Sequence, residues 1–226
     1  MGVLLLGSAC LAAGCATSIA ERRNDTSSTL YVGYVSSAFP TTFFPWQSRD
    51  GIAPTVSSMI YNTLFSFDDE TGEYLPSMAK EWCYTDYEGN PLVDESGEID
   101  YEQVEDYYSG DDKTYMVVKV TLFDNGTWSD GEPVTAEDVY YTLDVATDNT
   151  LSGHAGALAW TGDLQHKSEN GVLQEQGIYT YAHDEWGRYP YAEDERETVL
   201  YLHVNKVLGA VATIFTSILI LPEHIW

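Results

Sequence analysis

The stretch that most restricts the fold is "LFDNGTWSDGEPVTAEDVYYTL", residues 122–143. Its Asn-Gly and Asp-Gly pairs each favour a turn, and Trp128 between them supplies an apolar plug. Thr135 is the expected N-cap of a helix, with Asp138 three residues later as in a capping box. Residues 114–124, just before the turns, alternate as a strand does. Because each carboxylate serves a turn or a cap, the stretch predicts strand, turns and helix rather than a catalytic loop.

Other segments add strands and helices, so the sequence indicates an α/β fold. Residues 29–35 and 198–204 are β-rich and predict strands. Residues 207–221 form a 15-residue apolar run, which is short for a membrane span and predicts a buried helix followed by a strand. Another helix is predicted from an apolar stripe at helical spacing, formed by Val56, Met59, Ile60 and Leu64.

The charge balance excludes some classes of partner. The chain has 36 acidic and 10 basic residues, a formal net charge of −26, which repels nucleic acid. Residues 84–112 and 179–197 are acidic, tyrosine-rich stretches that we interpret as surface insertions. A calcium site in residues 84–112 is the alternative to a solvated loop, although the spacing of an EF-hand is missing. No pattern in the sequence indicates a cofactor or a metal site.

The first residues indicate secretion. The apolar run before Cys15 suits the central region of a signal peptide, and Leu11 to Cys15 resembles a bacterial lipobox. Residues 1–15 are therefore expected to be a lipoprotein signal peptide with Cys15 lipidated, and residues 16–28 a polar tether. Ala12 and the lack of a preceding Lys or Arg depart from this pattern, which suggests that the true start lies upstream or was trimmed. Cys83 is then left alone, so no intramolecular disulfide is expected.

Three segments together resemble one family. "YLPSMAKEW", "TLFDNGTWSDGEPVTAEDVYYTL" and "TVLYLHV…ILILPEHIW" are similar, in order and spacing, to family 5 extracellular solute-binding proteins, the peptide- and nickel-binding lipoproteins of ABC importers. The resemblance implies a type II periplasmic-binding-protein fold and a monomer held at the membrane by its lipid alone. It further implies a location in the periplasm or at the cell surface, a peptide or other small solute as ligand, and ABC permease subunits as partners.

The resemblance also implies a domain plan. Residues 29–55 would open lobe I, residues 56–150 would form an inserted small α/β domain, and residues 151–226 would continue lobe I. Members of the family are much longer than this chain, so the resemblance implies an N-terminal part without the C-terminal lobe.

The resemblance also implies ligand contacts, which are assigned by matching positions in this sequence to the family's motifs. Pro45 matches a proline after which the family lays an extended segment beside the ligand, and that segment would be Arg49, Asp50, Gly51 and Ile52. His154 falls where peptide-binding members place an aromatic near the pocket, and an ordinary loop histidine is the alternative. Trp46 and Trp160 are further candidates, and packing between lobes is the alternative for both.

The leading interpretation is a binding lipoprotein whose two lobes close over a ligand, and not an enzyme. One alternative is a secreted hydrolase, such as a glycosidase, that uses two carboxylates and aromatic platforms. A surface peptide receptor without transport is another.

Overall fold

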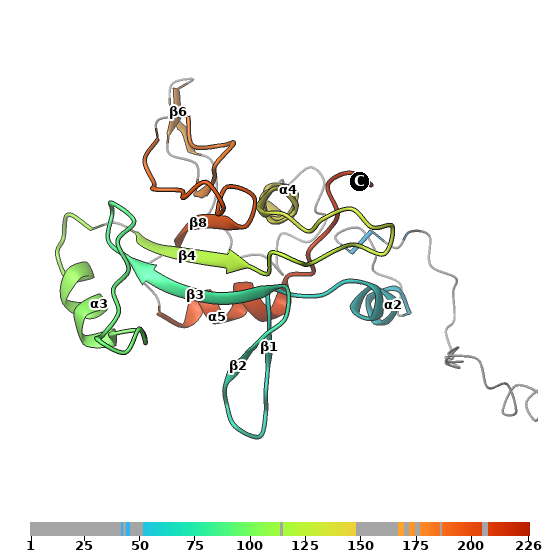
Figure 1. Cartoon of the computed structure of the whole chain (residues 1–226), viewed down its shortest axis with the longest axis horizontal. Coiled ribbons are helices and arrows are strands. Elements are labelled where there is room, and N and C mark those ends of the chain that lie inside the picture. The colour runs from blue at the N-terminus through green and yellow to red at the C-terminus, as the bar shows by residue number, and fades with distance from the viewer. Residues whose placement is uncertain are drawn as a thin grey trace, which may run out of the picture. The chain divides into compact units, whose positions relative to one another are not determined.

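The fold is built around an antiparallel four-stranded sheet in the order β3-β4-β8-β7. In the computed structural model these strands are β3 Ala79–Thr85, β4 Met116–Leu122, β8 Val199–Val204 and β7 Ile178–Thr180 (Figure 1). The central pair, β4 and β8, runs from Met116 opposite Val204 to Thr121 opposite Val199. The strands predicted at 114–124 and 198–204 are therefore confirmed and lie side by side.

The structure describes residues 42, 44, 45, 52–113, 115–147, 167–169, 172–174, 177–185, 187–204 and 208–226. All of them belong to one compact unit, Ala38–Trp226. Within this part of the chain, each helix is too short or too polar to cross a membrane. The predicted strand at 29–35 lies outside the described residues.

The main core lies on one face of the sheet. Helix α5, Leu208–Ser217, packs there, and its Phe215 ring lies 5.3 Å from that of Trp82 in β3 (Figure 1). Every second residue of β4 points into this core, since Met116, Val118, Val120 and Leu122 belong to it. Helix α4, Ala136–Thr147, adds Val139 and Leu143 to the same core. A helix at 207–221 was expected, but no strand follows it within residues 218–226.

The opposite face of the sheet carries a cluster of tyrosines. Val117 of β4 lies there with Tyr179, Tyr189 and Tyr201. The rings of Tyr189 and Tyr201 stack at 4.2 Å, and the Tyr201 hydroxyl donates to the carbonyl of Pro190. Tyr189 belongs to the second acidic insertion, so part of that insertion covers the sheet instead of extending into solvent.

The first acidic insertion is ordered by its own carboxylates. Asp86 Oδ1 accepts from the backbone N–H groups of Glu88 and Asn90, and Asp94 Oδ1 closes a similar turn. Helix α3, Tyr101–Tyr108, follows and is capped by Asp100. The hydroxyl of Tyr108 in α3 accepts from Val117 N–H, which ties the insertion to the sheet.

Helix α2, Ala53–Ile60, differs from the prediction. It begins earlier, with Pro54 in its first turn, where the missing N–H costs nothing. Its buried residues are Ala53 and Ser57, while Met59 and Ile60 are 63% and 58% exposed. The predicted apolar stripe was therefore wrong, because small residues face the protein here.

Two short hairpins complete the elements. Strands β1 Phe65–Phe67 and β2 Tyr74–Pro76 pair with each other and project from the rest of the described residues (Figure 1). Strands β5 Lys167–Glu169 and β6 Val172–Gln174 form the other hairpin. The main sheet joins β3 and β4, from the segment assigned to the small domain, to β7 and β8, from the segment assigned to lobe I.

Candidate functional site

The predicted ligand contacts lie almost entirely outside the described residues. Ile52 is described: it is half-buried, and its carbonyl accepts from Val56 N–H at the start of α2. The others fall outside the described ranges, as does the predicted lipidation site: Trp46, Arg49, Asp50, Gly51, His154, Trp160 and Cys15. Their roles as ligand contacts and as the lipidation site therefore stay a prediction.

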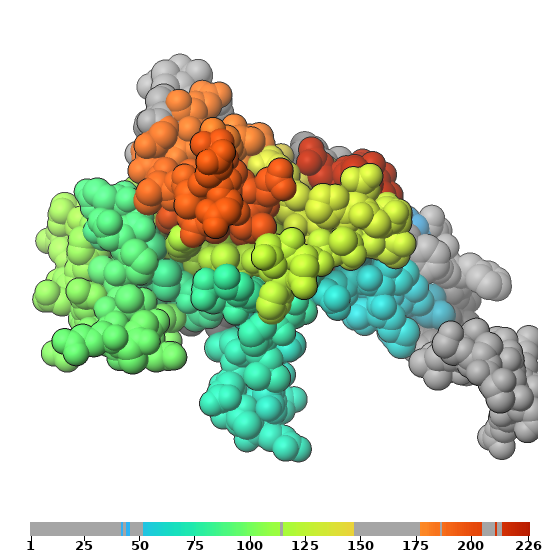
Figure 2. Space-filling view, in the orientation of Figure 1, coloured from blue at the N-terminus to red at the C-terminus, as the bar shows by residue number. Residues whose placement is uncertain are grey.

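A pocket of about 380 Å³ is the clearest candidate site in the described part of the chain. We call it the Trp128 pocket. Four segments line it: residues 60–62, 77–78, 123–134 and 222–226. Figure 2 shows the yellow-green segment 123–134 between the cyan α2 region and the red C-terminal segment. Its largest apolar lining residues are Ile60, Tyr61, Met78, Phe123, Trp128, Ile225 and Trp226.

The lining of the Trp128 pocket carries no charged side chain. Its polar groups are neutral: the side chains of Asn62, Ser77, Thr127 and Ser129. A reaction by general acid and base needs a pair of titratable groups at the reacting atoms. This pocket offers apolar contact and neutral hydrogen-bonding groups instead, which is the chemistry of a binding site.

Buried Asp138 ties the walls of the pocket together. It is 4% exposed, and its Oδ2 accepts from the Trp128 indole N–H at 3.1 Å and from Thr135 N–H at 2.9 Å. Its Oδ1 accepts from Glu223 N–H at 2.9 Å. The contact with Thr135 is one half of the capping box that the sequence predicts. The carboxylate of Asp138 thus has a structural role, as expected from the sequence.

Further hydrogen bonds fix the remaining walls. Phe123 N–H donates to the Met78 carbonyl at 3.3 Å, and Ile220 N–H donates to the Asn62 carbonyl at 2.9 Å. The backbone N–H of Trp128 donates to the Glu132 carbonyl at 2.8 Å, and this bond closes the turn that precedes helix α4. Because each of the four segments is bonded to another of them, to Ile220 or to Asp138, the walls of the pocket are held in place by the protein's own hydrogen bonds.

An ion pair and a ring contact hold the last residues of the lining. His224 Nε2 lies 2.8 Å from Asp130 Oδ2, and this hydrogen bond raises the pKa of His224. The Trp226 ring lies 5.1 Å from the ring of Phe44, which packs with Leu221 and Val145. The segment 222–226 is therefore held by His224 against Asp130 and by Trp226 against Phe44.

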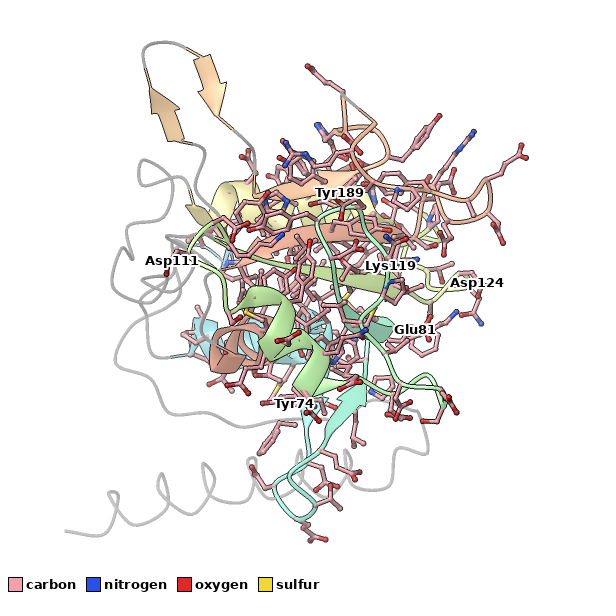
Figure 3. The ribbon with its side chains drawn as sticks, turned by 90° about the vertical axis from the view of Figure 1, so that its left-hand side faces the viewer. Tyr74, Glu81, Asp111, Lys119, Asp124 and Tyr189 are labelled. Atoms are coloured by element: carbon pink, nitrogen blue, oxygen red, sulfur yellow. The ribbon has the colours of Figure 1, made fainter. Side chains whose placement is uncertain are left out.

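A second hollow, of about 490 Å³, lies beside β3 and is charged. Glu81 of β3 and Lys119 of β4 line it from the same face of the sheet (Figure 3). Lys119 Nζ is paired with Glu195 at 3.0 Å. Burial raises the pKa of the Cys83 thiol in this hollow, so the thiol stays protonated and is a poor nucleophile. The hollow has neither an activated nucleophile nor a lining histidine.

The described histidine with the most perturbed pKa is buried away from both hollows. His203 is 4% exposed, stacks on Tyr115 at 4.1 Å, and has its Nε2 2.5 Å from the Tyr189 hydroxyl. Burial, together with the charge of Arg188, lowers the pKa of His203 to about 3. A neutral imidazole enclosed by tyrosines is a core residue, since no substrate reaches it.

Reasoning from the sequence alone missed most of the Trp128 pocket. Trp128 was expected to be an apolar plug, and it packs against the main core while also lining the pocket. Phe123 and Trp226 were not identified as lining residues. The signal available for them was the presence of large apolar side chains beside turn residues.

Solved structures with a similar fold include two OppA proteins bound to peptide and a periplasmic murein tripeptide-binding protein. OppA of Haemophilus influenzae in complex with RPPGFSPFR is 20% identical, with a TM-score of 0.50, and the match covers 83% of this chain and 30% of that one. The periplasmic murein tripeptide-binding protein MppA in an unliganded open form is 21% identical, with a TM-score of 0.50, covering 82% and 29%. Listeria monocytogenes OppA bound to peptide is 18% identical, with a TM-score of 0.50, covering 88% and 32%.

These matches show the fold. The chain has the α/β fold of type II periplasmic binding proteins, as its sequence predicts, and it spans about 30% of the length of OppA from H. influenzae. No protein-family model matches the chain. No curated protein matches it by sequence.

Proposed function

We propose that the chain is part of the substrate-binding lipoprotein of an ABC importer that captures peptides. The fold that it shares with the peptide-bound OppA structures is the observation that carries this proposal. The three sequence segments that resemble family 5 solute-binding proteins support it independently. Lipidation at Cys15 would hold the protein at the bacterial membrane, in the periplasm or at the cell surface.

The mechanism that we propose is closure of two lobes over the ligand, followed by delivery to the permease. A ligand shifts such an equilibrium only by its higher affinity for the closed state. Segment 49–52, with Trp46, His154 and Trp160, would contact the peptide from this chain. A second lobe would supply the opposite wall, since such sites bury 70–90% or more of a ligand of about drug size.

The Trp128 pocket favours a binder over a hydrolase. A glycosidase needs two carboxyl groups on either side of the scissile bond, and this pocket is lined by none. A surface receptor would share the same binding chemistry. Permease and ATPase genes beside the gene for this chain would identify an importer, and their absence would favour the receptor.

Calorimetry tests the proposed function. The protein from the complete reading frame, titrated with a defined mixture of tri- to octapeptides, should bind peptides with micromolar or tighter affinity. Residues 16–226 alone should bind far more weakly, because one wall leaves most of the peptide in water. Submicromolar binding by residues 16–226 would contradict closure of two lobes. Failure of the complete protein to bind any peptide would overturn the proposed substrate class.

A further inference from the structure

The Trp128 pocket selects against charged groups. With no charged side chain in its lining, it offers no side-chain partner to a charge that enters it, and removing a charge from water without a partner is costly. The net charge of −26 further disfavours an anion. The indole N–H of Trp128 already donates to Asp138, so Trp128 offers a ligand its apolar ring surface. The groups that suit this pocket are therefore uncharged and apolar.

The size of the pocket limits the occupant to a single group. A volume of about 380 Å³ is near the lower end of the 300–1,000 Å³ of small-molecule sites. It accommodates one large side chain with its adjoining peptide groups, rather than a whole oligopeptide. The neutral polar groups of Ser77, Thr127 and Ser129 are available to hydrogen-bond those peptide groups.

The rim of the pocket exposes large apolar side chains on a protein whose surface is otherwise highly acidic. Phe123 and Ile60, which both line the pocket, are 36% and 58% exposed. Clustered exposure of this kind is characteristic of binding sites. Because the hydrogen bonds to Asp138 and between the walls already hold the pocket open, a ligand would not bear the entropy cost of ordering it.

We propose that the Trp128 pocket binds one uncharged aromatic or long aliphatic side chain of a peptide ligand. The inference rests on the proposed function, and it extends that function by naming the residue class that this site selects. The pocket is separate from segment 49–52 in sequence, and so it adds a contact that the family resemblance does not assign.

The test is a titration of the 226-residue chain with capped amino acids, followed by the indole N–H signals in ¹H–¹⁵N NMR spectra. The probes are N-acetyl-phenylalaninamide, N-acetyl-leucinamide, N-acetyl-lysinamide and N-acetyl-glutamic acid amide. We expect the first two to shift the Trp128 and Trp226 signals to saturation and the two charged probes to leave them unshifted. Equal binding of all four probes, or saturating shifts with cellobiose but not with the phenylalanine probe, would overturn the proposal.

Two exposed phenylalanines provide a matched pair of variants. Phe123→Ala removes part of the pocket wall and should weaken binding of the phenylalanine probe about fivefold, as expected for the loss of part of a ring's contact area. Phe67→Ala removes a similarly exposed ring on β1, away from the pocket, and should leave binding unchanged. Thr127→Trp should fill the pocket and abolish the shifts. Equal effects of the two alanine variants would contradict the assignment.

The outcome separates this inference from the proposed function. If the probes bind saturably but the complete protein captures no peptide, the pocket would still be a site for uncharged apolar groups, and the proposed function would be wrong. Peptide capture with no probe binding at Trp128 would leave the function standing and overturn the pocket. The probe must also shift the same signals in the complete protein, and loss of the shifts there would mean that another segment fills the pocket.

Discussion

Replacing Asp138 by Asn should destabilise the protein strongly although the two side chains have nearly the same shape. The carboxylate accepts from three N–H groups, on Trp128, Thr135 and Glu223. An amide has one oxygen, so if that oxygen keeps the two bonds of Oδ2, the new NH₂ group faces the N–H of Glu223. The loss of one bond to a charged acceptor costs about 1.5–3 kcal/mol, and the remaining two weaken because the charge is gone.

We therefore expect Asp138→Asn to lower the free energy of unfolding by about 2–3 kcal/mol. Urea denaturation followed by circular dichroism measures this as a fall in the midpoint of roughly 1 M or more. Asp130→Asn is the control, since Asp130 is exposed and should give a much smaller shift. If Asp138→Asn left the midpoint unchanged, Asp138 would not be what holds the walls of the Trp128 pocket together.

Other predictions concern charge and modification. The pKa of His203 is about 3 in the folded protein against an ordinary 6.5, so the unfolded chain binds more protons between these values. As the pH falls below 6.5, His203 should therefore lower the free energy of unfolding by up to about 1.4 kcal/mol per pH unit. His203→Phe should remove this dependence between pH 6.5 and 5 in urea titrations, and an unchanged slope would refute the assignment. The NMR-measured pKa of His224 should lie above 6.5 and fall in Asp130→Asn, and its ion pair should stabilise the fold below pH 6.5 and be lost as the pH rises through that pKa. With an upstream basic start restored, a fatty-acid analogue should label the protein in a bacterial host, and label retained by Cys15→Ala would exclude lipidation there.

Local patterns predicted the elements whose stability comes from nearby residues. The alternation of β4 and the cap at Thr135 and Asp138 both depend on residues within a few positions of each other, so the sequence displays them directly. The prediction of an apolar stripe on α2 was wrong because contacts with residues far away in the sequence decide which side of that helix is buried. Spacing identified Met59 and Ile60, yet the structure buries Ala53 and Ser57.

The candidate site was harder to predict because distant segments form it. Asp138 was expected to cap its own helix, and nothing local shows that it also accepts from Glu223. The stacking of His203 on Tyr115 likewise depends on the pairing of β4 with β8. Composition indicated many aromatic residues, but only the tertiary pairing decides which of them line a pocket and which are core.

The order of the sheet strands has a consequence for how the chain is made. Strand β4 lies at the centre of the sheet, and its partner β8 follows only after residue 198. Hydrogen bonds between helix α4 and the residues around Pro222 span still more chain, 79 residues from Thr142 to Leu221 and 85 from Asp138 to Glu223. During synthesis, therefore, β4 emerges from the ribosome long before the strand that covers its edge. Over that interval an apolar strand edge is open to other chains, so we expect chaperone binding or prompt export to limit aggregation until β8 pairs with β4.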